Sequence, residues 1–566
     1  MEHIPAPLNR KFSIGLDFGT SSARALVVEV SSGEEVGTAV YDYPSGDQGV
    51  LLDPREPDLA RQNPRDYLDG LQECVRGAMR DAAKSDGFSA GDVIGMGVDT
   101  TGSTPLPVDS GGTPLAFDPR FREDVNAQVW LWKDHTGHAE AAEITSRARD
   151  ARPHYLAKCG GTYSSEWFWS KILHCARTAP DVFDAAYTWV EHADWMPAIL
   201  TGNANPSRIR RGVCAAGHKA MYNSAWGGYP DEDFLGSLDH RLVRVRRTLP
   251  SRAYHVAEPA GMLTEEWAER LGLPEGVPVA VGAFDAHLGA VGSGIRPGTL
   301  VRIVGTSTCD MMVAPMDDPL ADIPGLCGIV PESVLPGQYG LEAGQSAVGD
   351  IFNWFVRVIR PDGKDHAALT GEAERLRPGE SGLLALDWHN GNRTVLVDQR
   401  LTGMILGLTL HSTPAEIYRA LVEATAFGAR VIMERFEEYG LGVDRIVNCG
   451  GISARNRLVM QIYADVMGRA QHISRSSQTP ALGAAMAGAV VAGEAAGGHA
   501  DFDAAARAMT GVQEAVFHPD PQNRQIYDGI FRLYKRLHDA FGVRDSRDDL
   551  SDVMKALLAI RDEVRA

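Results

Sequence analysis

The chain contains few cysteines, and none of them stands at a spacing that cysteine chemistry uses. There are seven in 566 residues, an odd number, and no two are separated by two residues as in a redox or zinc motif. A disulfide framework is therefore not expected, and reduced cysteines in a cytoplasm are the simplest interpretation. Residues 1–7 contain no basic region followed by an apolar stretch, so no signal peptide is predicted and a cytoplasmic location is expected.

Positive charge is also scarce. Lys and Arg number 55 against 74 Asp and Glu, which gives a net charge of −19. This balance argues against a nucleic-acid or anionic-membrane partner, either of which would need a basic surface. A small anionic ligand held by backbone amides stays compatible with it.

Long hydrophobic runs are missing. The most membrane-like segment, 481–493, is too short to span a bilayer and consists mostly of Ala and Gly. We expect it to be a tightly packed buried helix, and no membrane partner is predicted. At 566 residues the chain is too long for a single core. Two large domains are therefore the default expectation.

Several common site motifs are missing as well. The segment Gly363-Lys364 is followed by Asp365 rather than Ser or Thr, so there is no P-loop. No Gly-x-Gly-x-x-Gly sequence opens a helix, which disfavours a dinucleotide-binding fold. His135 and His138 could share a helix face. No third ligand stands near them, so a solvated surface is favoured over a metal site.

The most informative feature that is present occurs twice. Residues 14–24 and 300–313 each consist of an apolar run, a Gly-Thr-Ser turn with further hydroxyls, and a second apolar run. Each pattern predicts a β-hairpin. Gly in the turn lets the backbone approach a ligand, so that its N–H groups can point at an anion. Two such turns, with Asp17 before the first, favour a site that grips a nucleotide polyphosphate from both sides over two ordinary turns.

Predicted strands alternate with predicted helices along the chain. Helix starts are expected at Asn63-Pro64, Pro414, Pro480 and Ser551. Alternating strands and helices predict an α/β protein. Strands are expected at 14–17, 25–30, 93–98, 277–283, 301–304 and 446–448.

A Gly-rich, Pro-containing run at 289–298 is the best candidate for a domain boundary. It lies just before the second predicted hairpin. We therefore expect one domain at about 1–294 and another at about 295–566, each with a hairpin near its start.

Two aspartates follow predicted strands. Asp99 is either a turn cap or a ligand-binding residue at the carboxyl end of a sheet strand, and both interpretations stay open. Asp285 precedes a Gly-rich segment and suits a general base that accepts a hydroxyl proton during phosphoryl transfer. It could equally cap a helix, and the two roles are compatible.

With these motifs the chain resembles, nearly from end to end, the FGGY carbohydrate kinases of the actin–hexokinase–heat-shock ATPase superfamily. Segments 17–22 and 305–308 are similar to the two phosphate loops of that family. Segment 450–456 is similar to its adenosine motif, and segment 480–485 to its second connecting helix. The resemblance implies two actin-like (ribonuclease H-like) α/β domains with an ATP cleft between them.

The resemblance also implies ATP and Mg²⁺ as cofactors. Mg²⁺ is expected beside Asp17, through water, because this ion keeps much of its hydration. The residues implied in nucleotide binding are Asp17, Gly19, Thr20, Ser21, Ser22, Arg24, Gly305, Thr306, Ser307, Thr308, Gly450, Gly451 and Asn456.

Within the family, segments 97–104, 131–136, 210–219 and 340–346 are most similar to the kinases that act on L-ribulose. The implied reaction transfers the γ-phosphoryl group of ATP to the 5-hydroxyl of L-ribulose in L-arabinose catabolism. Asp285 is implied as the catalytic base. The implied sugar contacts are Gly102, Ser103, Trp132, Lys219, Asp285 and Glu342. A Lys donor and a Glu acceptor can fix the register of a ketopentose.

Other functions stay open at this point. One is a kinase for another ketopentose or polyol, such as D-ribulose or xylulose. A more distant one is an actin- or chaperone-like ATPase without a sugar substrate, which the lack of a long appended peptide-binding domain disfavours. The sequence does not give the oligomeric state, and a homodimer stays open.

Overall fold

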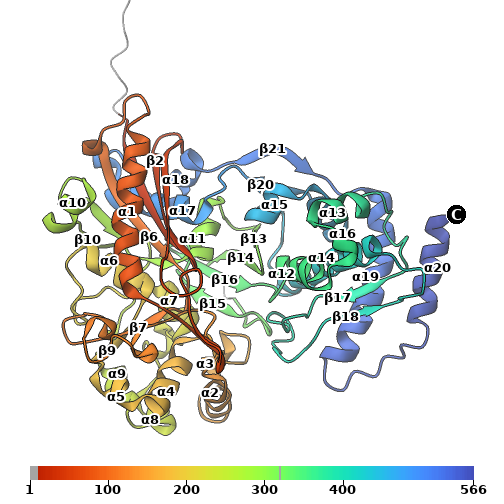
Figure 1. Ribbon diagram of the computed structural model, residues 1–566, viewed down its shortest axis with the longest axis horizontal. Coiled ribbons are helices and arrows are strands. Elements are labelled where there is room, and N and C mark those ends of the chain that lie inside the picture. The colour runs from red at the N-terminus through yellow and green to blue at the C-terminus, as the bar shows by residue number, and fades with distance from the viewer. Residues whose placement is uncertain (1–9, 318–319) are drawn as a thin grey trace, which may run out of the picture.

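The computed structural model describes residues 10–317 and 320–566 (Figure 1). Residues 1–7, for which the sequence predicts no signal peptide, lie outside the described residues. Two seven-stranded sheets form the centre of the protein, and helices alternate with their strands. The predicted α/β class is therefore confirmed.

The first sheet has the strand order β10-β11-β6-β1-β2-β3, with β12 also paired to β6. Its central strand β1 is antiparallel to β2 and parallel to β6. The strands are β1 (Phe12–Phe18), β2 (Ser22–Glu29), β3 (Glu35–Asp42), β6 (Val93–Thr100), β10 (Pro259–Met262), β11 (Pro278–Ala280) and β12 (Ala283–Phe284).

The second sheet follows a similar plan, in the order β15-β16-β14-β13-β19-β20-β21. Its strand β13 is antiparallel to β14 and parallel to β19, as β1 is to β2 and β6. Each sheet thus has a hairpin at its centre. The strands are β13 (Thr299–Val304), β14 (Thr308–Pro315), β15 (Gly328–Pro331), β16 (Gln338–Ala343), β19 (Arg445–Cys449), β20 (Gln471–Ser474) and β21 (Val512–Phe517).

Five of the six predicted strands are present within a few residues of their expected limits. The exception is 277–283, where the structure has two short strands, β11 and β12, in place of one. The break falls at Gly282, whose backbone passes so close to Ala193 that a Cβ would lie 2.1 Å from the Ala193 carbonyl oxygen. Close approach to a neighbouring helix is a long-range effect, which local sequence does not reveal.

The predicted helix starts are confirmed except the last. Helix α1 (Pro64–Ala82) begins after Asn63, whose side chain accepts a hydrogen bond from the Arg65 amide. Helix α14 (Pro414–Glu438) and helix α17 (Thr479–Ala492) also carry Pro in their first turns. Helix α20 (Val553–Arg565) begins two residues after Ser551, and Asp552 precedes it without capping it. The Asp552 carboxylate is bound to Arg536 instead, at 2.7 Å.

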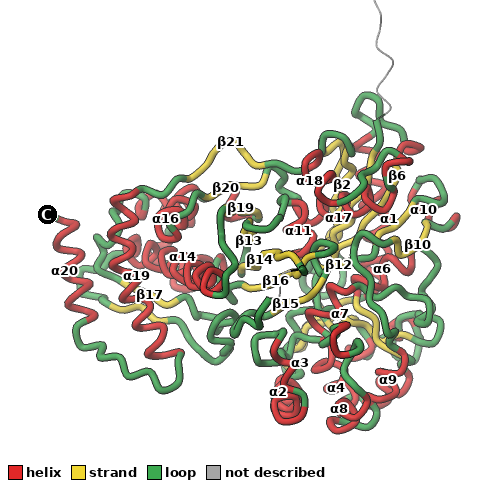
Figure 2. Tube along the Cα trace, turned by 180° about the vertical axis from the view of Figure 1, so that it is seen from behind, coloured by secondary structure: helices red, strands yellow, loops and turns green. Residues whose placement is uncertain are grey.

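Helix α17 comes late in the chain but packs on the first sheet. It is the buried Ala- and Gly-rich helix that the sequence predicts. The glycines of β1 and β6 allow the close contact: a Cβ at Gly97 would lie 2.0 Å from the Ala484 carbonyl oxygen, and one at Gly15 1.7 Å from that of Ala481. Helix α11 (Asp285–Gly292) packs against α17 and shares a hydrophobic core with β13 and β14. Figure 1 shows both helices between β6 and β13, and Figure 2 shows them from behind.

The remaining elements surround the two sheets. Within the described residues, no helix is long and apolar enough to cross a membrane. The seven cysteines all lie in the described part and are free. The other helices are α2 (His138–Ala151), α3 (Pro153–Ala157), α4 (Phe168–Thr178), α5 (Pro180–Ala185), α6 (His192–Leu200), α7 (Val213–Lys219), α8 (Glu232–Leu238), α9 (Leu242–Thr248), α10 (Glu265–Leu271), α12 (Gly349–Trp354), α13 (His366–Ala373), α15 (Gly451–Arg455), α16 (Arg457–Met467), α18 (Phe502–Met509) and α19 (Pro521–Gly542). The short strands are β4 (Leu51–Asp53), β5 (Glu56–Gln62), β7 (Pro105–Val108), β8 (Val129–Trp130), β9 (Thr188–Glu191), β17 (Leu384–Leu386) and β18 (Met404–Leu406).

Candidate active site

The turns of the two central hairpins border one cavity of about 270 Å³. In each turn the Gly amide donates back across the turn, from Gly19 to the Ser22 carbonyl and from Gly305 to the Ser307 carbonyl, both at 2.9 Å. A Cβ would lie 3.4 Å from the nearest atom at Gly19 and 3.8 Å at Gly305, which are ordinary contacts. The fold itself therefore leaves room for a side chain at both turns. Packing within the protein therefore does not explain why these positions are Gly. A ligand that comes close to the backbone would explain it.

Nearly half of the predicted site residues line this cavity, and they come from both halves of the chain. Helix α17 contributes Pro480 to the same wall. The predicted residues that line it are Thr20, Gly102, Trp132, Lys219, Asp285, Gly305, Thr306, Ser307 and Glu342. The Trp132 indole N–H donates to the Thr20 hydroxyl at 3.0 Å, which fixes the ring against the first turn.

Other predicted residues lie along the same hairpins without lining the cavity. Asp17, Gly19, Ser21, Ser22 and Arg24 belong to β1, β2 and the turn between them. The Arg24 guanidinium is 3.8 Å from the Asp17 carboxylate. An arginine next to Asp17 offsets part of the negative charge at this edge of the sheet.

The Gly450-Gly451 turn follows β19, beside the second hairpin. Gly450 has a φ of +93°, and a Cβ there would lie 2.5 Å from the Val304 carbonyl oxygen. Here the fold itself requires glycine. Asn456 accepts a hydrogen bond from the Val459 amide and so caps α16.

Two predicted residues direct their side chains away from the cavity. The Ser103 hydroxyl is fully buried and donates to the Glu191 carboxylate. The Thr308 hydroxyl accepts from the Gln345 amide at 2.9 Å. Of the predicted turn 102–103, it is Gly102 that borders the cavity.

Three carboxylates gather at the carboxyl end of the first sheet. Asp17 on β1 stands directly opposite Asp99 on β6, and Asp99 also pairs in register with Ala283, two residues before Asp285. Asp99 is fully buried, and within the described chain no amide or hydroxyl donates to it; its carboxyl group, when protonated, instead shares a hydrogen bond with the Asp17 carboxylate. A turn cap would accept from a nearby amide, which Asp99 does not, and its role in ligand binding stays a prediction.

Burial raises the pKa values of all three carboxyl groups. For Asp285, burial and then the charge of Asp17 raise the pKa to about 7. The pKa of Asp99 lies well above its usual range, because of burial and the charges of Asp17 and Asp285. Burial also raises the pKa of Asp17, and Arg24 opposes that shift. A carboxyl group with a pKa near neutrality is suited to proton transfer.

A buried ion pair forms another wall of the cavity. The Lys219 ammonium, at the end of α7, is 3.1 Å from both carboxylate oxygens of Glu342 on β16. Burial alone would lower the pKa of Lys219, but the Glu342 charge outweighs it and raises that pKa. Burial likewise opposes ionisation of Glu342, but Lys219 holds its pKa well below the usual range. Both groups are therefore charged, and each stabilises the other.

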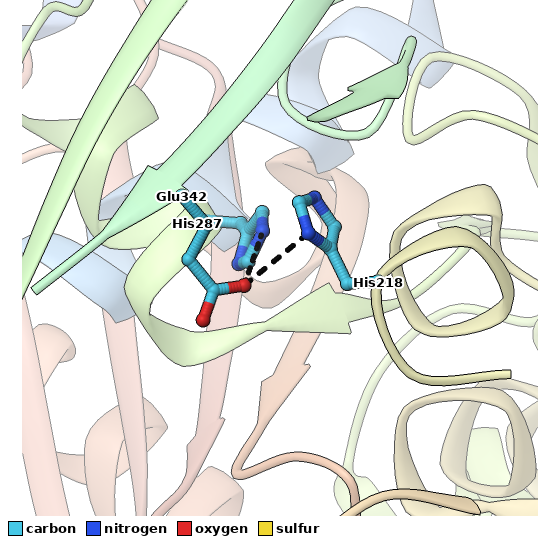
Figure 3. A group of neighbouring side chains, drawn as sticks. All are labelled: His218, His287 and Glu342. Carbon is cyan, nitrogen blue, oxygen red and sulfur yellow. Dashed lines mark ion pairs between the residues drawn. The ribbon is translucent and has the colours of Figure 1, made fainter. Parts of the chain in front are cut away.

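Two histidines stand around the same carboxylate, as Figure 3 shows. His218 Nδ1 is 3.2 Å and His287 Nε2 is 3.8 Å from Glu342 Oε2. Burial lowers the pKa of His287 to about 4, and it lowers the pKa of His218 well below its usual range. Both rings are thus neutral near pH 7 and offer one donor and one acceptor each.

His218, His287 and Glu342 also have the spacing of a metal site, with ligand atoms within 4.8 Å of one another. The Lys219 ammonium argues against this use, because it already contacts both oxygens of Glu342. A metal ion bound there would stand next to a fixed positive charge. Neutral donors and acceptors around one ion pair fit a polyhydroxylated ligand better.

Sequence reasoning missed several residues that border this cavity, among them the basic side chains of His287 and Arg393. His287 lies two residues after Asp285, so a closer look at that helix could have found it. Arg393 belongs to an irregular segment and donates to the Thr308 carbonyl at 2.6 Å. No local pattern indicates that contact.

Family models identify both halves of the chain. The N-terminal domain of the FGGY family of carbohydrate kinases matches residues 12–292, and the C-terminal domain of that family matches residues 300–492. The chain is an FGGY carbohydrate kinase. The predicted resemblance is therefore confirmed, and the chaperone-like ATPase is set aside. An FGGY kinase transfers a phosphoryl group from ATP to a small sugar.

Relatives of similar length support this assignment. The chain is 42% identical to a ribulokinase of Shouchella clausii (strain KSM-K16), over 98% of this chain and 99% of that protein. It is 41% identical to a ribulokinase of Geobacillus thermodenitrificans (strain NG80-2), over 99% of each.

Solved structures confirm the two-domain fold of this FGGY kinase. A xylulose kinase from Rhodospirillum rubrum has a TM-score of 0.74 and 25% identity, covering 94% of this chain and 99% of that one. A Plasmodium falciparum glycerol kinase solved with ADP has a TM-score of 0.75 at 15% identity, covering 93% of this chain and 98% of that one. At that identity the likeness concerns the fold alone.

Proposed function

We propose that this FGGY kinase phosphorylates L-ribulose at its 5-hydroxyl. One observation carries the proposal: the candidate base Asp285 and the Lys219–Glu342 pair line the same cavity as both hairpin turns. A hydroxyl acceptor, a base and a phosphate-binding backbone are the parts that phosphoryl transfer needs. The full-length similarity to two ribulokinases supports L-ribulose as the sugar.

The nucleotide is proposed to lie with its phosphates between the two turns. The turn amides and hydroxyls of Thr20, Thr306 and Ser307 offer donors to phosphate oxygens without needing a basic surface. The adenosine end would extend toward the Gly450-Gly451 turn, because β19 runs parallel to β13 and ends beside the second hairpin.

Mg²⁺ is proposed to sit beside Asp17, through water. The residues at this edge fit such an ion, because the carboxyl groups of Asp17, Asp99 and Asp285 gather at the ends of neighbouring strands. Hard carboxylate oxygens are the ligands that Mg²⁺ prefers. When bound, the ion would neutralise charge on the phosphate oxygens.

Asp285 is proposed to accept the proton of the sugar hydroxyl as that oxygen attacks the γ-phosphorus. Its carboxylate is held in place at the start of α11, where it accepts from the Ala286 amide at 2.6 Å. Lys219 and Glu342 would bind other oxygens of the sugar and so orient the 5-hydroxyl toward the phosphate.

The division into domains at about 1–294 and 295–566 is part of the same proposal. All strands of the first sheet precede residue 294, and all strands of the second follow it. A homodimer stays a prediction, and the chemistry proposed here needs only one chain.

A coupled assay of ADP release tests the sugar. The purified protein would be offered L-ribulose, D-ribulose, L-xylulose, D-xylulose and glycerol at equal concentrations, with Mg²⁺ and ATP. We expect kcat/KM to be highest for L-ribulose. A higher value for any other acceptor would overturn the proposed substrate and leave the sugar kinase assignment intact.

A further inference from the structure

His287 borders the cavity, and among the described residues its ring has no hydrogen-bond partner. Its side chain is 2% exposed, and within the described chain both ring nitrogens are unpaired. The Glu342 Oε2 atom is 3.8 Å from Nε2, which is too long for a hydrogen bond. Leaving a buried polar group unpaired is unfavourable, so such groups need an explanation.

The ring is held in one orientation by its aromatic neighbours. It meets His218 edge to face, with centroids 4.4 Å apart and planes at 64°, and Phe284 at 5.8 Å and 67°. His218 is fixed in turn, because its Nε2 lies 2.9 Å from the Ser333 hydroxyl. A polar ring that is positioned but unpaired, at the wall of a cavity, is prepared for a ligand.

The chemistry of the ring selects the kind of ligand. A neutral imidazole offers one donor and one acceptor, and a sugar hydroxyl can serve either nitrogen. A cation is disfavoured, since the Lys219 ammonium occupies the carboxylate that would complete a metal site. An anion is disfavoured as well, because Glu342 stands next to the ring.

We infer that His287 hydrogen-bonds a hydroxyl of the sugar other than the one that is phosphorylated, and that it thereby determines sugar specificity. The inference rests on the proposed function, because it assumes that the sugar occupies the cavity between Asp285 and Glu342. The sugar hydroxyl that is phosphorylated is the one that Asp285 is proposed to deprotonate, so His287 would bind a different hydroxyl. A site in which His287 hydrogen-bonds a sugar hydroxyl disfavours an analogue that lacks that hydroxyl, because the buried ring is then left without a partner.

An unpaired histidine is not by itself a binding residue, and His192 provides the comparison. Both ring nitrogens of His192 also lack a partner in residues 10–317 and 320–566, and its side chain is 1% exposed. That ring stacks on Tyr67 with centroids 3.7 Å apart and does not border the cavity. His192→Leu is therefore a matched control, which removes the same groups from a buried site elsewhere.

The test combines His287→Leu with substrates that each lack one hydroxyl. The sugar that the wild-type protein uses best is chosen first, and deoxy analogues of it are then compared. We expect His287→Leu to lower kcat/KM for the intact sugar by about 5- to 150-fold, with little change in the KM for ATP. For one deoxy analogue the variant and the wild type should be nearly equal, and that analogue identifies the partner hydroxyl. His192→Leu should show the wild-type pattern.

The outcomes separate the two proposals. An equal loss for every analogue, or no loss for any, would overturn the role of His287 while the sugar kinase activity stands. A wild-type protein that phosphorylates no pentulose would overturn the proposed function and this inference together.

Should His287→Leu fold poorly by circular dichroism, His287→Gln serves as a second variant, because it keeps an amide donor and acceptor. The His287→Gln variant should then keep a larger ratio of kcat/KM between the intact sugar and the identified analogue than the His287→Leu variant does. Equal ratios in the two variants would indicate that His287 contributes only packing. Zinc binding by the wild type that is lost in either variant would indicate a metal site instead.

Discussion

At the scale of single residues, Asp285 shows how position changes the chemistry of a carboxyl group. It stands at the start of α11 next to two other aspartates, and burial brings its pKa to about 7. An exposed aspartate would be ionised at neutral pH but would be a weak base.

Replacing this base should reduce turnover more than binding. Asp285→Asn keeps the size of the side chain but cannot accept a proton. We expect kcat to fall by roughly 10²–10⁴-fold, with a smaller change in KM, since the lost interaction forms mainly in the transition state. Steady-state kinetics measure both, and near-normal turnover would remove Asp285 from this role.

The raised pKa of Asp285 also predicts opposite effects of pH on activity and stability. With both substrates well below saturation, kcat/KM should fall about tenfold per pH unit below pH 7, because the base must be ionised. The unfolded carboxyl loses its proton near 3.8 and the folded one near 7. This group therefore stabilises the fold below about pH 4, and that stabilisation is lost as the pH rises to 7.

Chemical denaturation of the wild type and Asp285→Asn checks the stability part. The variant, which cannot ionise, should gain stability relative to the wild type as the pH rises from 4 to 7. A difference that does not change with pH would contradict the raised pKa.

At the scale of elements, the two hairpin turns and the glycines under α17 use the same residue type for different reasons. A Cβ fits at Gly19 and at Gly305 but not at Gly97, where it would lie 2.0 Å from a backbone oxygen of α17. The strand therefore needs glycine for packing, whereas at the turns packing does not require it and the proposed phosphate contact would explain it.

Substitutions at the turns should affect ATP binding and leave the fold largely intact. Gly19→Val and Gly305→Val place methyl groups where phosphate is proposed to lie. We expect calorimetry to show weaker binding of ATP to each variant, at a melting temperature close to that of the wild type. Normal binding by either variant would contradict the proposal that both turns hold the phosphates.

Substitution in the strand should do the reverse. Gly97→Ala forces β6 and α17 apart, and overpacking of this kind costs about 1–3 kcal/mol. We expect a lower free energy of unfolding, with ATP affinity of the folded protein little changed. Unfolding curves in urea measure the first and calorimetry the second. Wild-type stability would mean that the contact between strand and helix is looser than described.

The helices and strands that could be predicted from the amino-acid sequence are those whose ends are marked by local residue patterns. Asn63-Pro64 marks a helix start by capping and fixed geometry, and the Gly-Thr-Ser turns mark hairpins. The elements that it missed depend on distant contacts. The break at Gly282 comes from Ala193, and the position of Arg393 comes from Thr308. The same holds for the site: resemblance pointed to Lys219 and Glu342, but their pairing appears only in the fold.

At the scale of the whole molecule, the Lys219–Glu342 pair joins the two halves of the chain. Lys219 belongs to a helix that precedes α11, and Glu342 to the second sheet. The side chains are each 7% exposed, so removing one leaves the other charge buried and alone.

Single and double substitutions should separate the structural role of this pair from its role in binding. Lys219→Met or Glu342→Gln alone should cost about 3–5 kcal/mol of stability and raise the KM for the sugar. The double variant should regain much of the stability, because no unpaired charge remains, but it should not regain sugar affinity. Thermal unfolding and kinetics on all four proteins test this. A double variant that is as unstable as the sum of the single ones would contradict a pairwise interaction.

The packing of α17 on the first sheet has a consequence for how the protein is made. Strands β1 and β6 are complete by residue 100, whereas the helix that covers them is made almost 400 residues later, at Thr479–Ala492. At roughly 5–20 residues per second, the apolar face of these strands stays uncovered for about 20–80 s. During this interval the nascent chain exposes a surface that invites aggregation. Chaperone dependence during translation should therefore be confined to the period before residue 492 is added, and a chain released at residue 294 should need the rest of the protein supplied in trans.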